Sequence, residues 1–328
     1  MRFVFGRGSL VAALAVVLVS LGALPAAAKV GGQNGQIVFS RFTEDFSDSS
    51  TYIVNSGGGD PRPLFPLSTS SSAHWSPNGT EIAVNSGLDF PCCSGHTVII
   101  NPDTGAFRVV NPEGPPAVLT FCTLWSPDAG RFACEAFNDD DPSVDGVYTV
   151  RSSDGGGLTR ITNGPDVPID YSPDGNQIVF SRASHPDCTT KSALYVVNID
   201  GSGLHQVTPY GFCDDGGGWS PNGQWIVFSR SPVPRGGSIH SKGGGQLFVV
   251  HPDGTGLRQV VLQTPNRVFA FDASWSPDGT KIVCGSFSQT TGMAGIATAN
   301  ADGSDFEQIT SSPTIDHQPD WGAKPPTP

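Results

Sequence analysis

Short runs of apolar and β-branched residues recur along the chain, separated by turns rich in Gly, Pro, Asn and Asp. One stretch illustrates the pattern, because Ile178–Phe180 is followed by Leu194–Val197 and then by Gln206–Thr208. Runs this short, with this composition, favour strands over helices. The pattern therefore predicts short antiparallel strands joined by tight turns.

A sequence motif repeats at a nearly constant interval, with an aromatic residue, Ser, Pro, and then Asp or Asn, usually followed by Gly. Pro and Asp-Gly or Asn-Gly form tight turns, so each copy marks a hairpin between two strands. Two more strands complete each unit, and four antiparallel strands in about 45 residues are typical of a β-propeller blade. The aromatic positions, 46 to 56 residues apart, are Trp75, Trp125, Tyr171, Trp219, Trp275 and, without Ser-Pro, Trp321.

The two ends of the repeat region each hold part of a unit. Residues 34–41 contain a turn and a second strand with no aromatic strand before them, whereas Trp321 lies in register with nothing after it. We expect these segments to share one blade, which closes the ring without exposed strand edges. The predicted fold is thus all-β, a six-bladed β-propeller.

The composition supports a folded ring and excludes one class of function. Gly and Pro, at 41 and 28 residues, argue against a mainly helical protein, while 37% hydrophobic residues suffice for a core. A formal net charge of −12 argues against a nucleic-acid binder, which needs a basic surface.

The first 28 residues have the order of a secretory signal peptide. Arg2 and Arg7 precede an apolar stretch at 10–24, and small residues at 26–28 follow. We therefore predict a signal peptide at 1–28, a propeller at 29–324 and a Pro-rich tail at 325–328. The mature protein is expected to be secreted or periplasmic, with no membrane span after cleavage.

The repeat resembles a known family. A Trp-Ser-Pro-Asp-Gly motif followed by an Ile-x-Phe strand is similar to the WD40-like (PD40) repeat of the TolB-like propellers, and Trp219–Gly223 with Ile226–Phe228 has this pattern with Asn in place of Asp. The resemblance implies a six-bladed ring and is much less specific for function. It also leaves open a cation such as calcium in the central channel, although we otherwise expect no cofactor.

Catalytic motifs with a fixed local pattern are absent from the sequence. Arg41, Arg182 and Arg230 end equivalent strands and would project toward one face, where they would either bind an anion or pair with nearby Asp residues. Three acidic residues precede aromatic positions on the innermost strands: Asp170, Asp272 and Asp320. Their carboxylates would either line the channel mouth as ligand-binding groups or be solvated or paired with arginine.

The seven cysteines predict disulfides if the protein is exported. Cys188 and Cys213 fall in neighbouring loops, so we expect them to form one bond. Cys122 is expected to bond Cys92 or Cys93. Two alternatives remain open, a Cys92–Cys93 bridge or a Cys122–Cys134 cross-strand pair.

Two cysteines replace the Phe of other repeats and are interpreted as buried thiols, Cys134 and Cys284. A zinc site would compete with the Cys188–Cys213 bond for the same loops. Its ligands would come from His185, Asp187, Cys188, Cys213 and Asp214.

We therefore predict a monomeric scaffold that binds a protein or peptide partner in the cell envelope or outside the cell. The alternative is a propeller-fold hydrolase or lyase acting on carbohydrates or lactones at the channel mouth. The binding face would carry the long loops at 86–97, 136–146, 182–193, 211–218 and 230–245.

Overall fold

The computed structural model describes residues 32–43, 48–64, 70–86, 96–111, 119–138, 140–184, 191–232, 245–264 and 267–325. The predicted signal peptide lies outside these residues, as do Cys92, Cys93 and Cys188. The structure therefore does not test the predicted domain boundaries.

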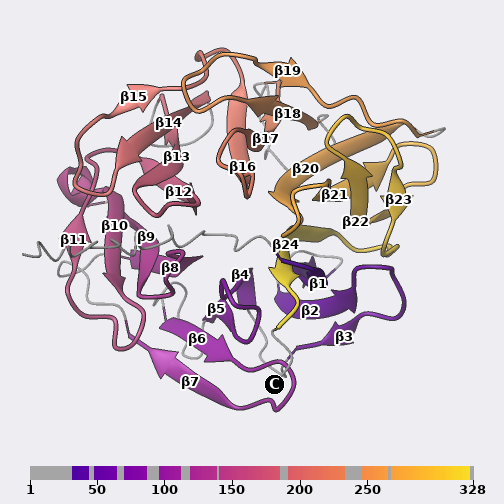
Figure 1. Cartoon of the computed structure of the whole chain (residues 1–328), viewed down its shortest axis with the longest axis horizontal. Coiled ribbons are helices and arrows are strands. Elements are labelled where there is room, and N and C mark those ends of the chain that lie inside the picture. The colour runs from indigo at the N-terminus through magenta and orange to yellow at the C-terminus, as the bar shows by residue number, and fades with distance from the viewer. Residues whose placement is uncertain are drawn as a thin grey trace, which may run out of the picture.

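The described residues form six four-stranded antiparallel sheets arranged as blades around a common centre (Figure 1). Blades 1 to 5 follow one another along the chain, and blade 6 contains both chain ends. The innermost strands are β4 (Ser70–Trp75), β8 (Leu119–Trp125), β12 (Asp166–Tyr171), β16 (Cys213–Trp219), β20 (Val268–Trp275) and β24 (Asp316–Ala323). The second strands are β5 (Ile82–Ser86), β9 (Arg131–Phe137), β13 (Gln177–Ala183), β17 (Ile226–Ser231), β21 (Lys281–Ser288) and β1 (Asn34–Phe42). The third strands are β6 (His96–Ile100), β10 (Gly146–Arg151), β14 (Ser192–Asn198), β18 (Gln246–Val250), β22 (Ala294–Asn300) and β2 (Ser49–Asn55). The outermost strands are β7 (Phe107–Val110), β11 (Thr159–Arg160), β15 (His205–Gln206), β19 (Arg258–Gln259), β23 (Glu307–Gln308) and β3 (Arg62–Pro63).

The repeat motif builds the turn between the first and second strands through a fixed set of hydrogen bonds. In blade 3, the Ser172 hydroxyl donates to Asp174 (2.6 Å) and accepts from the backbone N–H of Gln177 (2.9 Å). Asp174 also accepts from the N–H of Asn176, so one carboxyl holds both ends of the turn. Blades 1, 2, 4 and 5 repeat the network, which explains why the motif requires Ser followed two residues later by Asp or Asn. We refer to the ring face with these turns as the turn face, and to the opposite one as the loop face.

Each innermost strand carries an irregularity in its register with the second strand, two or three residues before the aromatic position. In four blades the residue three positions before the aromatic adopts a left-handed backbone: Ser72, Gly216, Asp272 and Gln318 have φ between 47° and 54°. Such bulges increase the local twist and redirect side chains. They place the residues around this position against the channel.

The ring closes as the repeat predicts, because β24 from the C-terminus pairs with β1 from the N-terminus. Figure 1 shows the yellow β24 beside the indigo β1. Arg41 and Asp316 face each other across this pairing and form a bidentate ion pair with distances of 2.6 and 2.8 Å. The prediction of a blade shared by both chain ends is confirmed.

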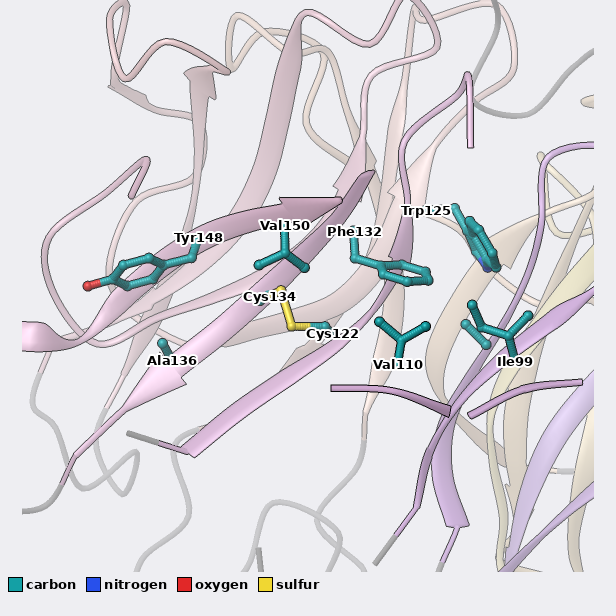
Figure 2. Close-up of a cluster of buried hydrophobic side chains, with 10 residues drawn as sticks. Ile99, Val110, Cys122, Trp125, Phe132, Cys134, Ala136, Tyr148 and Val150 are labelled. Atoms are coloured by element: carbon teal, nitrogen blue, oxygen red, sulfur yellow. A yellow bond between two sulfur atoms is a disulfide. The ribbon is translucent and has the colours of Figure 1, made fainter. Parts of the chain in front are cut away.

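The hydrophobic core lies within and between the blades. Figure 2 shows one cluster, in which Ile99 and Val110 of blade 1 pack against Trp125 and Phe132 of blade 2. The Trp125 indole N–H also donates to the carbonyl of His74 in blade 1 (3.2 Å). Apolar clusters shared by two neighbouring blades recur around the ring and hold successive blades together.

The same cluster contains a disulfide between Cys122 and Cys134, which is the cross-strand alternative, and the expected bond from Cys122 to Cys92 or Cys93 is wrong. Cys122 lies within β8 rather than in an inter-blade loop, directly opposite Cys134 of β9, with Cα atoms 4.2 Å apart. Directly opposed residues of antiparallel strands come close enough to bond. The interpretation of Cys134 as a thiol is therefore also wrong.

The helical content of the described residues is limited to the short 3-10 segment Pro142–Val144. Within these residues, no helix has the length and apolar character needed to cross a bilayer.

The shared blade gives a test of stability. Replacing Arg41 by Gln leaves the fully buried Asp316 without its bidentate partner, and we expect the free energy of unfolding to fall by about 2–3 kcal/mol. Urea denaturation followed by tryptophan fluorescence measures this change. The control is Arg151→Gln, which breaks an exposed pair with Asp154 and should leave stability nearly unchanged. Equal effects of the two variants would show that the pair does not hold the ring closed.

Candidate functional site in the central channel

The six innermost strands surround a cavity of about 360 Å³ along the axis of the ring. Its wall is acidic, and among the described residues that line it there is no Lys or Arg. Clustered carboxyl groups in a cavity are suited to cation binding and to acid–base chemistry. The lining carboxyl residues are Glu135, Asp170, Asp215, Asp272 and Asp320.

Two of these residues connect neighbouring blades. The Asp170 carboxylate accepts from the backbone N–H of Trp219 in the next blade (2.9 Å). The Asp320 carboxylate likewise accepts from the N–H of Trp75 (2.8 Å) and from the Ser274 hydroxyl (3.1 Å). Both predicted acids therefore line the channel, and both hold innermost strands together.

Asp272 belongs to a different arrangement, nearer the loop face. Its backbone N–H donates to the Ser229 hydroxyl, and its carboxylate accepts from the N–H of Gln318 (3.3 Å). The imidazole Nδ1 of His317, behind the channel wall, lies 3.6 Å from the same carboxylate. An acid and a histidine thus meet at the wall of the channel, where the bulges of β20 and β24 bring them together.

Asp215 of β16 lies beside this pair. Burial is the main cause that raises its pKa to about 7, and the charges of Asp272 and Asp214 add to the effect. Among the described residues, the Asp215 carboxyl forms no hydrogen bond or ion pair that would stabilise its charge. Asp215 can therefore exchange a proton near neutral pH.

Glu135 of β9 is a second carboxyl of this kind, at blade 2. Burial raises its pKa to about 7, with a smaller contribution from the charge of Asp145. It also lacks a hydrogen-bond partner within the described part of the chain. Sequence reasoning missed Asp215 and Glu135 because neither stands in the repeat motif, although Glu135 is notable as an acid inside an otherwise apolar strand.

Comparisons with solved structures identify the architecture. A structure titled as a putative TolB from Agrobacterium tumefaciens superposes with a TM-score of 0.61 at 18% identity, covering 88% of this chain and 92% of that one. TolB from Acinetobacter baumannii gives a TM-score of 0.66 at 19% identity, covering 88% and 67%. This chain is a TolB-like six-bladed β-propeller in fold.

Two further comparisons show more distant or partial similarity. An oligogalacturonate lyase from Vibrio parahaemolyticus shares the fold with the TolB-like propeller, with a TM-score of 0.53 at 12% identity over 84% of this chain and 79% of the lyase. An uncharacterized protein of Agrobacterium fabrum, Atu1656, is 28% identical over 197 residues, which are 55% of this chain. The match spans 62% of that relative's length. No family model matches the chain.

The three predicted arginines of the TolB-like propeller lie near the loop face, and each forms a bidentate ion pair within its own blade. Arg182 binds Asp166 at 2.6 and 2.7 Å, and Arg230 binds Asp214 at 2.7 and 2.6 Å, as Arg41 binds Asp316. The structure thus contains the carboxylate pairing that the sequence offered as the alternative to anion binding.

Each of these guanidinium groups also stacks on aromatic rings. Arg230 lies 4.8 Å from the ring centre of Phe212 and 4.9 Å from that of Phe248. Arg182 lies 5.0 Å from that of Tyr195, whose ring neighbours Tyr210. We call Arg182, Arg230, Tyr210 and Phe212 the aromatic–arginine patch of blades 3 and 4.

The remaining cysteine predictions have mixed outcomes. Cys284 is a buried thiol as expected, and burial raises its pKa to about 12. Cys213 is buried, but its predicted partner Cys188 lies outside the described residues, so that bond stays a prediction. Within the described residues, no three His, Cys, Asp or Glu side chains are arranged to hold a metal ion. His185 and Asp187 of the zinc alternative also lie outside them.

The elevated pKa of Asp215 predicts a specific pH dependence of stability. Because the folded state holds its proton more tightly than the unfolded chain, Asp215 contributes stability at low pH that is lost as the pH rises toward 7. An Asp215→Asn variant removes this loss. We expect it to exceed the wild type in free energy of unfolding by on the order of 2 kcal/mol at about pH 8, with little gain at about pH 4.

Urea titrations at both pH values measure the difference between the two proteins. Glu135→Gln should show the same pH dependence as Asp215→Asn, because burial raises the pKa of the Glu135 carboxyl in the same way. A difference between Asp215→Asn and wild type that stays constant from acid to alkaline pH would contradict the assignment.

Proposed function

We propose that this protein is an exported propeller that binds a peptide or protein segment on its loop face. The observation that carries the proposal is the aromatic–arginine patch of blades 3 and 4. Tyr210 is 38% exposed and Phe212 is 43% exposed, although both are large apolar side chains on a loop. Exposed aromatic residues beside arginine are the composition typical of energetic hot spots in protein interfaces.

The two arginines of the patch are held in place before any partner binds. The fully buried carboxylates of Asp166 and Asp214 fix Arg182 and Arg230, and these two guanidinium groups in turn support the rings of Tyr195 and Phe212. The propeller side chains that such a partner covers would lose little entropy on binding, because they are already held.

The export part of the proposal rests on two observations. The first residues have the order of a signal peptide, and the chain contains a Cys122–Cys134 disulfide within its core. Disulfides persist in oxidising compartments and are rare in the cytosol. The partner would accordingly be found in the cell envelope or outside the cell.

The binding role can be tested with a displayed peptide library selected against the immobilised protein. Selected peptides should lose at least about tenfold in affinity for the Tyr210→Ala/Phe212→Ala double variant, because the exposed rings supply the apolar contact area. The control is Phe107→Ala, at an exposed ring on blade 1 that lies outside the patch. If peptides bind the double variant as well as the wild type, the patch is not the binding surface.

A second candidate function, a hydrolase or lyase acting in the channel, is favoured by one specific observation. The Asp272–His317 pair lies beside Asp215, whose pKa of about 7 suits proton transfer at neutral pH. The fold similarity to an oligogalacturonate lyase supports a uronate oligomer as the first substrate to test.

For this candidate we expect the wild type to convert oligogalacturonate to unsaturated products, detected by their ultraviolet absorbance. Asp215→Asn should then lower the turnover by about a hundredfold or more, the usual contribution of a positioned general acid or base. The patch variant Phe212→Ala should not change the turnover. Absence of unsaturated product with the folded wild-type protein would overturn the lyase reading.

A further inference from the structure

A second cavity lies on the turn face between blades 2 and 3, separate from the channel. Its volume is about 340 Å³, within the range of small-molecule sites. The turns of the two blades meet beside it, because Gly175 packs against the ring of Pro127. The side chains that line it include Asp128, Arg131, Thr149, Tyr171 and Asp174.

The two blades that flank this cavity depart from the repeat at adjoining positions. Tyr171 occupies the aromatic position at which the other five copies have Trp. Ala129 has φ of 56°, in the left-handed position where the turns of blades 1, 3, 4 and 5 have Gly. Strained or irregular positions of this kind tend to concentrate at functional sites.

Tyr171 is only 2% exposed, and its buried hydroxyl has no hydrogen-bond partner among the described residues. Burial raises the pKa of Tyr171, and the charges of Arg131 and Asp128 act on the same hydroxyl. A buried donor without an acceptor is costly, so a ligand oxygen that accepts from this hydroxyl would bind favourably.

Arg131 adds a cation whose hydrogen bonds all go to neutral oxygens. Its guanidinium donates to the Thr149 hydroxyl and carbonyl and to the Gly157 carbonyl, at distances between 2.7 and 3.0 Å, with a longer contact to Thr159. Unlike the three arginines at the loop face, Arg131 forms no ion pair with any described residue. The hydrogen bond from the Ser126 hydroxyl is the main cause that lowers the pKa of Asp128, and the charge of Arg131 adds to it. Both hydrogen bonds to this carboxyl, from Ser126 and Gly130, go to Oδ1, and its Oδ2 accepts none in the described structure.

The cation of Arg131 and the carboxylates of Asp128 and Asp174 together determine which class of ligand fits the cavity. An anion would face Asp128 and Asp174, and a cation would face Arg131. A hydroxyl group satisfies both, since it accepts from a guanidinium or a phenol and donates to a carboxylate. A neutral ligand with several hydroxyl groups therefore fits the cavity better than a charged one.

We propose that the turn-face cavity between blades 2 and 3 binds one unit of a neutral saccharide, held by Arg131, Asp128 and Tyr171. The site lies on the opposite face from the aromatic–arginine patch and does not depend on the function proposed for that patch.

The test uses the full-length mature protein and four neutral sugars: glucose, galactose, mannose and N-acetylglucosamine. Saturation-transfer NMR detects binding, and titration gives the affinity. We expect at least one sugar to bind, with Tyr171→Phe weakening its binding about tenfold through loss of the hydroxyl contact. Because that hydroxyl has no partner in the free protein, the same variant should unfold at the same or a higher temperature than wild type.

Tyr171→Trp restores the residue of the other five repeats and should abolish sugar binding, because the indole fills the cavity while the blade keeps its fold. The matched control is Tyr148→Phe, which removes a hydroxyl that donates to the carbonyl of Val144 away from the cavity and should leave sugar binding intact. The proposal is overturned if no neutral sugar binds the folded wild type, if Tyr171→Trp binds as well as wild type, or if glucuronate or glucosamine binds in preference to the neutral sugars.

Discussion

The pairing of β24 with β1 is the constraint on which the rest of the ring depends. It joins residues 275 positions apart in the Arg41–Asp316 pair and removes the two strand edges that an open array of blades would expose. Closure also completes the circle of inter-blade contacts, because Asp320 of the shared blade binds the backbone of Trp75 in blade 1. The channel, the loop face and the turn face keep their geometry only while this junction holds.

The residues at the loop-face end of the second strands fall into two patterns. Blades 3, 4 and 6 have Phe-Ser-Arg, with Tyr or Phe opposite the Phe on the third strand and Asp opposite the Arg on the innermost strand. In blades 1, 2 and 5 the aromatic position holds Val84, Cys134 or Cys284, and the Arg position holds Ser or Ala. The guanidinium needs both a carboxylate and flanking rings in the same blade, so the four residues occur together or not at all.

The fold could be predicted from the sequence because the turn chemistry is local. Ser172, Asp174 and the N–H of Gln177 form their network within six residues, so the period of the motif fixes the strand order, the blade count and the shared blade. The Cys122–Cys134 bond stood only as an alternative to a bond with Cys92 or Cys93, for the opposite reason. Its register depends on where β8 begins and on the irregularity between Cys122 and Leu124, and neither has a sequence signal in the repeat.

The channel site was found only in part from the sequence, on similar grounds. Asp170 and Asp320 could be found because each precedes an aromatic of the motif, whereas Asp215 and His317 are brought toward Asp272 by bulges on three separate strands. Glu135 reaches the same channel from a second strand, a position that no local pattern marks. Distances between blades are properties of the closed ring and are absent from any one repeat.

A repeat protein has an internal reference for its own function, because each copy shows what the scaffold alone requires. Trp at the aromatic position and Gly in the turn satisfy the scaffold in most blades, so Tyr171 and Ala129 are not needed for folding. The same comparison marks Glu135, the acid at a position where blades 3, 4 and 6 have Ser and blade 5 has Gly285. Each departure costs stability, through an unpaired hydroxyl, a strained backbone or a buried carboxyl, and each lines or adjoins a cavity. Departures from the repeat that cost stability and lie at a cavity are most simply explained by ligands that the cavity holds.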